Sequence, residues 1–243
     1  MPERPLLVTG VTAVTVDAQR RIIDDAAIAV EGPLIVAVDR TATLVERFPG
    51  AERIDGRGMV AIPGLIDTHG HADQSILRGT TDDLHWVPFL RDWVDPYLLR
   101  RQPTDAVAAY RLSALEMIKS GTTCFVSPNV DPRDDLGALA AAMGELGLRA
   151  VLARWTEPGA PIDEAIDAVR RWDGAAGGLI QAWFGLMVPR QAGDVCAPEF
   201  YRAVADAARA LGTGLTYHFC SEIEDAEYYE TEFGQRPAEW ALA

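Results

Sequence analysis

The chain has 243 residues and a formal net charge of -14, with 22 lysines and arginines against 36 aspartates and glutamates. This acidic balance argues against a protein that binds nucleic acid, because that class needs a basic surface. No apolar run approaches the roughly 20 residues of a membrane-spanning helix, and the cysteines form no CxxC pair or disulfide framework. We therefore expect a cytoplasmic protein with neither nucleic acid nor membrane as a partner.

The N-terminal part of the chain predicts a small β-sheet. Residues 5–62 contain short runs rich in valine, isoleucine and threonine, which glycine and proline interrupt. Runs of this kind are typical of strands.

From Met59 onward, short apolar runs alternate with helical patterns. Thr104 is a candidate N-cap of the first long helix and Gly121 a candidate stop. Such an alternation predicts a parallel sheet, either a barrel or a doubly wound layer. The expected strands cover 59–66, 122–127, 148–154, 179–187 and 214–219, and the expected helices cover 104–120, 134–146, 161–173, 197–211 and 222–233.

Two histidines follow the first of these strands. His69 and His71 come just after the apolar run Met59–Ile66, in the stretch "DTHGH". Side chains alternate along a strand, so Asp67, His69 and His71 should point to one side. Active sites gather at the carboxyl ends of parallel strands, where two imidazoles form a pair of metal ligands. Two histidines that hydrogen-bond to the backbone are an equally good interpretation of this motif alone.

A third histidine ends the fifth expected strand. His218 is followed four residues later by Glu222, at the start of the next expected helix. A metal needs at least three protein ligands, and a carboxylate beside its open position can move protons. The alternative is a core histidine followed by a glutamate that stabilises a helix start through the helix dipole. Taken with the first pair, the pattern favours a metal-dependent enzyme.

These motifs resemble those of a known family. "VAIPGLIDTHGHADQSILRG" and "YHFCSE" resemble the first and fifth barrel strands of the amidohydrolase superfamily. "EFGQRPAEWA" is similar to the helix that follows in the branch of cytosine, guanine and adenosylhomocysteine deaminases and triazine hydrolases. The resemblance implies an α/β fold. Residues 1–58 would form the N-terminal part of a small β-sandwich, and residues 59–243 about five of the eight strands of a (β/α) barrel.

The resemblance also implies the roles of the metal-site residues. His69, His71 and His218 resemble the ligands of one divalent metal ion, Zn²⁺ or Fe²⁺, and Glu222 resembles the general acid/base. Binuclear members bridge two metals with a carboxylated lysine on strand four, whereas the only lysine here is Lys119, in the helix before strand two. The mononuclear subtype is therefore favoured.

Four further residues are candidates for substrate binding. Gln74 matches a substrate-contacting glutamine of the triazine-hydrolase branch, and His85 and Trp86 lie in a stretch that resembles a substrate-covering segment. Simple packing is the alternative for Trp86. Arg190 stands where many deaminases have a histidine, and a guanidinium suits a carboxylate or phosphate. An exposed arginine without a role is the alternative there.

The implied reaction is hydrolysis of C–N bonds other than peptide bonds, on a small cyclic amidine or a related compound. The alternatives are an amide, carbamate or urea hydrolase, or a dechlorinase, of the same superfamily. The family also uses a histidine on strand six and an aspartate on strand eight, and all four histidines of this chain lie before those positions. We therefore expect either the first part of a longer enzyme or a truncated, inactive chain. The expected partners are a small-molecule substrate and either further copies of the chain or the missing C-terminal half.

Overall fold

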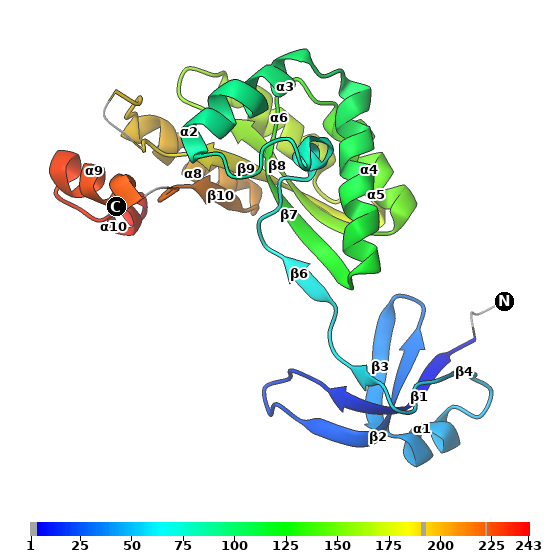
Figure 1. Ribbon diagram of the computed structural model, residues 1–243. Helices are drawn as coiled ribbons and strands as arrows, with labels where there is room; N and C mark the ends of the chain where they lie inside the picture. The colour runs from blue at the N-terminus through cyan, green and yellow to red at the C-terminus, as the bar shows by residue number, and fades with distance from the viewer. Residues whose placement is uncertain (1–3, 191–192, 222) are drawn as a thin grey trace. The chain divides into compact units, whose positions relative to one another are not determined.

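The computed structural model describes residues 4–190, 193–221 and 223–243. The chain divides into two compact units between Gly64 and Leu65, and each has a sheet of its own (Figure 1). The assignment of 1–58 to a β-sandwich and 59–243 to a barrel domain stays a prediction. Within the described ranges, no helix is long and apolar enough to cross a membrane.

The first unit is one mixed sheet with strand order β3-β2-β1-β4, and β5 pairs with β1. Strands β1, β2 and β3 are antiparallel neighbours, whereas β4 and β5 run parallel to β1. Helix α1 packs Leu44 against Leu7 of β1 and the small side chains of β2. The elements are β1 (Leu6–Val14), β2 (Ile22–Glu31), β3 (Leu34–Arg40), α1 (Thr41–Arg47), β4 (Glu52–Asp55) and β5 (Val60–Ala61).

The second unit is a parallel half-barrel with the strand order β10-β9-β8-β7-β6. Every neighbouring pair is parallel, and helices connect the successive strands. The predicted α/β fold with five parallel strands is confirmed. The strands are β6 (Leu65–Asp67), β7 (Thr122–Val130), β8 (Arg149–Thr156), β9 (Ile180–Met187) and β10 (Leu215–His218).

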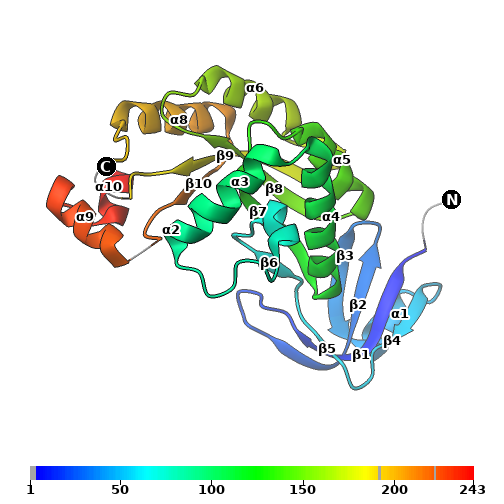
Figure 2. The same ribbon diagram turned by 45° about the horizontal axis from the view of Figure 1, so that its top comes forward.

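The helices of this unit fall into two groups. One group connects strands and packs against the sheet: α4 (Pro103–Lys119), α5 (Leu136–Leu146), α6 (Ile162–Trp172), α7 (Ala175–Gly178) and α8 (Pro198–Leu211), with α9 (Ile223–Phe233) and α10 (Pro237–Leu242) after β10. The other group lies in the long connection between β6 and α4: η1 (Ala72–Leu77), α2 (Trp86–Phe89), η2 (Leu90–Val94) and α3 (Asp95–Arg100). The last three follow one another without a break (Figure 2), and we call residues 86–100 the covering segment.

Helix α4 begins earlier than the sequence suggested. Its N-cap is Gln102 rather than Thr104, because Pro103 occupies the first helical position, where its missing N–H costs nothing. The Gln102 N–H donates to Asp105 Oδ2 at 2.8 Å, which completes a capping box. At the other end Gly121 has a φ of 87°, a left-handed value that glycine adopts without strain. This glycine turns the chain into β7.

The expected strand over 59–66 is two short strands in two different sheets. Val60 and Ala61 pair with β1 of the first unit, whereas Leu65 begins the pairing with β7 of the second. Pro63 lies between them, and it has no N–H to donate to a sheet ladder. The apolar run therefore changes sheets instead of continuing in one.

Two apolar clusters hold the half-barrel together. One packs α4 and α5 against β7 and β8 through buried side chains such as Tyr110, Phe125 and Leu152. The other packs α6, α8 and α9 against β9, through Phe184 and Tyr229 among others. The strands are thus fixed along their length, and their carboxyl ends make a rigid support for side chains.

Close packing within the sheet gives a test of this arrangement. A Cβ at Gly185 in β9 would stand 2.0 Å from the carbonyl oxygen of Pro128 in β7, closer than real Cβ atoms approach anything. We expect Gly185→Ala to lower the free energy of unfolding by about 3 kcal/mol, the upper part of the overpacking range. Urea unfolding measures the change. Gly50→Ala, where the added carbon meets nothing within 4 Å, should change it by less than ~0.5 kcal/mol. Equal stability of the two variants would contradict the packing.

Candidate active site

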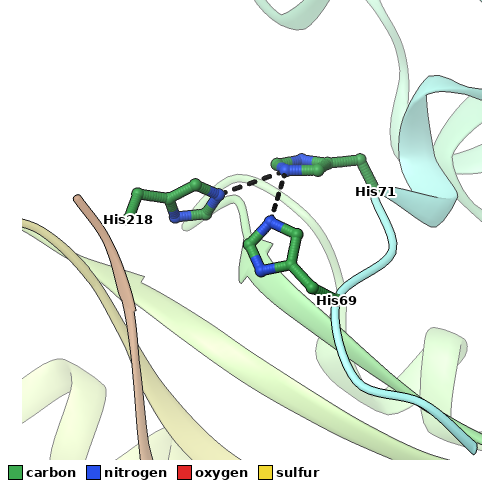
Figure 3. Close-up of side chains that lie close together, drawn as sticks. All are labelled: His69, His71 and His218. Atoms are coloured by element: carbon green, nitrogen blue, oxygen red, sulfur yellow. Dashed lines mark hydrogen bonds between the residues drawn. The ribbon is translucent and has the colours of Figure 1, made fainter. Parts of the chain in front are cut away.

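Three imidazoles converge at the carboxyl ends of the first and fifth strands of the half-barrel (Figure 3). His69 and His71 follow β6, and His218 is the last residue of β10. The Nε2 atom of His71 lies 3.3 Å from Nε2 of His69 and 3.1 Å from Nε2 of His218. The potential ligand atoms of all three lie within 4.8 Å of one another. Burial increases from His69, which is exposed, to His218, which is 8% exposed.

A turn, rather than strand alternation, orients the first two histidines. Strand β6 ends at Asp67, before either of them. The backbone N–H of His69 donates to Asp67 Oδ1 at 3.1 Å, and the N–H of Gly70 donates to the carbonyl of Val126 in β7 at 2.9 Å. A Cβ at Gly70 would lie only 2.9 Å from Asp67 Oδ2. Glycine at this position therefore lets the turn close and brings both rings to the same place.

The cluster has the protonation state and the spacing that a metal needs. Burial lowers the pKa of His71 to about 4, and repulsion from His218 and His69 adds to the effect. Burial also lowers the pKa of His218 to about 4, and repulsion from His69 is the second cause. Both rings are thus neutral at pH 7, as metal ligands must be. Two zinc–nitrogen bonds of ~2.0–2.1 Å at a tetrahedral angle place the nitrogens about 3.3 Å apart, close to the two separations of the His71 Nε2 atom from those of His69 and His218. These residues fit one divalent ion.

The lowered pKa values make stability depend on pH. The ordinary histidine pKa is 6.5, so between pH 6.5 and 4 the unfolded chain binds more protons at His71 and His218 than the folded one. Their contribution is therefore fully present above pH 6.5 and is lost as the pH falls towards 4. We expect the metal-free protein to lose roughly 1–3 kcal/mol per histidine between pH 7 and pH 4.5.

Urea unfolding at pH 7, 5.5 and 4.5 measures this loss. Carboxyl groups also titrate in this range, so the double variant His71→Gln/His218→Gln serves as the reference. It should lose less stability than the wild type over the same interval. Identical losses would show that the two imidazoles are not held neutral by burial.

A cavity of about 450 Å³ lies beside the cluster, and His71 and His218 form part of its wall. Aromatic and aliphatic side chains make up much of the rest, with amide and carboxyl groups between them. An apolar cavity with a few polar groups is the usual form of a small-molecule site. Its other lining residues are Gln74, Trp86, Phe89, Leu90, Val94, Asp95, Leu98, Asn129, Asp131, Trp155, Glu157 and Met187.

The candidate substrate-binding residues differ in their positions. Gln74 lines the cavity, and its Nε2 lies 3.3 Å from Nδ1 of His71. Trp86 lines it as well, with the Arg190 guanidinium carbon 5.7 Å from its ring centroid. The described residues that line the cavity do not include Arg190 or His85. His85 is exposed and precedes α2. Their roles stay predictions. Glu222, the candidate acid/base, lies outside the residues that the structure describes.

Sequence reasoning missed several residues of the cavity wall. Trp155 packs edge-on to His218, with 5.7 Å between the ring centroids. Asn129 and Asp131 line the cavity near the end of β7, as Trp155 does near the end of β8. The signal was present, since each stands at the carboxyl end of a predicted parallel strand.

A parallel half-barrel with three convergent imidazoles at its strand ends is an arrangement typical of metal-dependent enzymes. The sequence model of the Amidohydrolase family matches residues 60–242. The chain belongs to this family.

Individual relatives agree with this membership. The chain is 35% identical, over 240 residues, to 5-methylthioadenosine/S-adenosylhomocysteine deaminase of Pelotomaculum thermopropionicum, covering 97% of this chain and 54% of that protein. A triazine hydrolase of Arthrobacter aurescens has a similar fold, with a TM-score of 0.81 and 24% sequence identity. The match covers 99% of this chain and 58% of the triazine hydrolase. A zinc-bound adenosine deaminase of Xanthomonas campestris also has a similar fold, with a TM-score of 0.80 and 24% sequence identity. The match covers 98% of this chain and 54% of that protein. The chain spans about half the length of the curated relatives it matches.

Proposed function

We propose that the protein is a metal-dependent hydrolase that cleaves non-peptide C–N bonds and releases ammonia from a small aminated heterocycle. One observation carries the proposal: three imidazoles converge, and two of them, His71 and His218, are held neutral by burial and line an apolar cavity. Membership of the Amidohydrolase family supports it.

The residues of this chain divide the work between them. His69, His71 and His218 would hold one divalent ion, with zinc favoured by the all-imidazole donor set, and the ion would supply an activated water. The aromatic wall would exclude bulk water and hold a flat ring, while Gln74 donates to or accepts from its edge. Glu222 would deliver a proton to the ring nitrogen as carbon is attacked.

A purine nucleoside is the favoured substrate class. Relatives at 29–35% identity carry the name 5-methylthioadenosine/S-adenosylhomocysteine deaminase. A cavity of about 450 Å³ has room for a ring system with a substituent. Gln74 beside His71 also matches the triazine-hydrolase branch, so a chlorinated or aminated triazine is the second candidate.

The test is a substrate panel on the full-length zinc-loaded protein. We expect ammonia release from 5-methylthioadenosine, S-adenosylhomocysteine or adenosine, its loss after chelation and its return with zinc. Chloride release from atrazine without ammonia release from purines would favour the triazine reaction. Turnover that survives chelation, or none with any compound, would contradict the proposal and favour an inactive chain.

A further inference from the structure

We infer that Arg101 is a positioning residue for the histidine cluster and the cavity. Its guanidinium joins the end of the covering segment to the turn after His71 and to the loop after β7. The inference takes the cluster and cavity of the proposed function as the site that Arg101 serves.

The contacts of Arg101 are almost completely buried. Its Nη1 donates to Asp73 Oδ2 at 2.9 Å, and its Nη2 donates to Asp134 Oδ2. The three side chains are between 1% and 4% exposed. The guanidinium carbon also lies 5.4 Å from the centroid of the Tyr97 ring, whose hydroxyl donates to the Asp73 carbonyl at 2.8 Å. Arg101 and Tyr97 together therefore fix both the side chain and the backbone of Asp73.

Each of the three segments joined in this way contributes to the cavity. Asp73 lies between His71 and Gln74, two cavity residues at the start of η1. Asp134 follows the end of β7, after the lining residues Asn129 and Asp131. Arg101 itself caps α3, the last helix of the covering segment, which supplies six lining residues from Trp86 to Leu98. The Arg101 guanidinium thus joins the three segments that line the cavity.

Stability alone is a poor explanation for this triad. Two carboxylates and one guanidinium are removed from water, each at a large desolvation cost, and apolar replacements of such groups are often equally stable. Asp73 Oδ1 also has no hydrogen-bond partner within the described ranges, which adds a further penalty. The planar fork of arginine, in contrast, can hold two carboxylates at a fixed distance, which a lysine cannot do.

The inference is tested with Arg101→Met and Arg101→Lys in the full-length protein. Zinc affinity is measured by competition with a chromophoric chelator, and amide hydrogen exchange is followed over residues 86–100. We expect Arg101→Met to weaken zinc binding 10- to 100-fold, the usual effect of losing a residue that orients a ligand. Exchange in the covering segment should accelerate, and Arg101→Lys should fall between the wild type and Arg101→Met. If Arg101→Met does not fold, the zinc affinity and the exchange rates of Arg101→Lys alone test the inference.

Two control variants separate positioning from stability. Met143→Ala removes a fully buried side chain of α5 and should lower the urea midpoint of unfolding while leaving the zinc affinity unchanged. Arg111→Met breaks the exposed ion pair between Arg111 of α4 and Glu145 of α5 and should change neither quantity. Unchanged zinc affinity and unchanged exchange in both Arg101 variants would overturn the inference, as would a loss of affinity that Met143→Ala reproduces.

The outcomes also separate this inference from the proposed function. Zinc binding by the wild type without turnover on any substrate would refute the function and leave the Arg101 comparison intact. If the wild type binds no zinc, the proposed function fails, and the exchange rates of residues 86–100 decide whether Arg101 fixes that segment.

Discussion

Replacing His71 or His218 by alanine should weaken zinc binding by roughly 10²–10³-fold. The binding free energy of zinc at a site of four ligands is ~10–16 kcal/mol in total, so each imidazole accounts for a few kcal/mol of it. His71 should be the more sensitive position, because its Nε2 stands within 3.3 Å of both other Nε2 atoms. Competition with a chromophoric chelator at pH 7 gives the dissociation constants.

The fourth histidine provides a matched control for this experiment. His85 is exposed and stands at the N-cap of α2, outside the cluster. His85→Ala should leave the zinc affinity within about twofold of the wild type. An equal loss in all three variants would indicate nonspecific binding to surface histidines and would refute the cluster as the metal site.

Replacing Glu222 by glutamine should retain zinc and lower turnover of the full-length protein by roughly 10²–10⁴-fold, which is the usual contribution of a general acid/base. Glutamine has nearly the same shape as glutamate but no ionisable proton. Ammonia release under saturating substrate, with zinc content measured on the same samples, separates loss of proton transfer from loss of metal.

Glu199 provides the comparison for Glu222. It is an exposed acidic residue in the first turn of α8, where a negative charge interacts favourably with the helix dipole. Glu199→Gln should leave turnover unchanged. If Glu222→Gln behaves in the same way, Glu222 has no part in the chemistry.

Much of the half-barrel was predictable because its strands are short apolar runs between amphipathic helices. Strand β9 and helix α5, for example, coincide with the predicted ranges to within two residues. The strand over 59–66 was wrong because a run of apolar letters does not reveal its pairing partners. Val60 pairs with the first sheet and Leu65 with the second, on either side of Pro63.

The site was predictable only in part. Three histidines after two parallel strands, together with a family resemblance, were enough to expect that the rings would meet, because such strand ends lie at one edge of a sheet. The triad of Arg101, Asp73 and Asp134 was not predictable, since its members are separated by 28 and 33 residues and belong to no local pattern. Contacts of this kind depend on the tertiary fold.

The central claim is that His69, His71 and His218 hold one catalytic metal ion. Crystals of the protein grown with one equivalent of zinc, measured on both sides of the zinc absorption edge, test this claim most directly. The account predicts a single strong anomalous peak about 2.0–2.1 Å from one ring nitrogen of each histidine. A peak at another position, or none at this cluster, would contradict it.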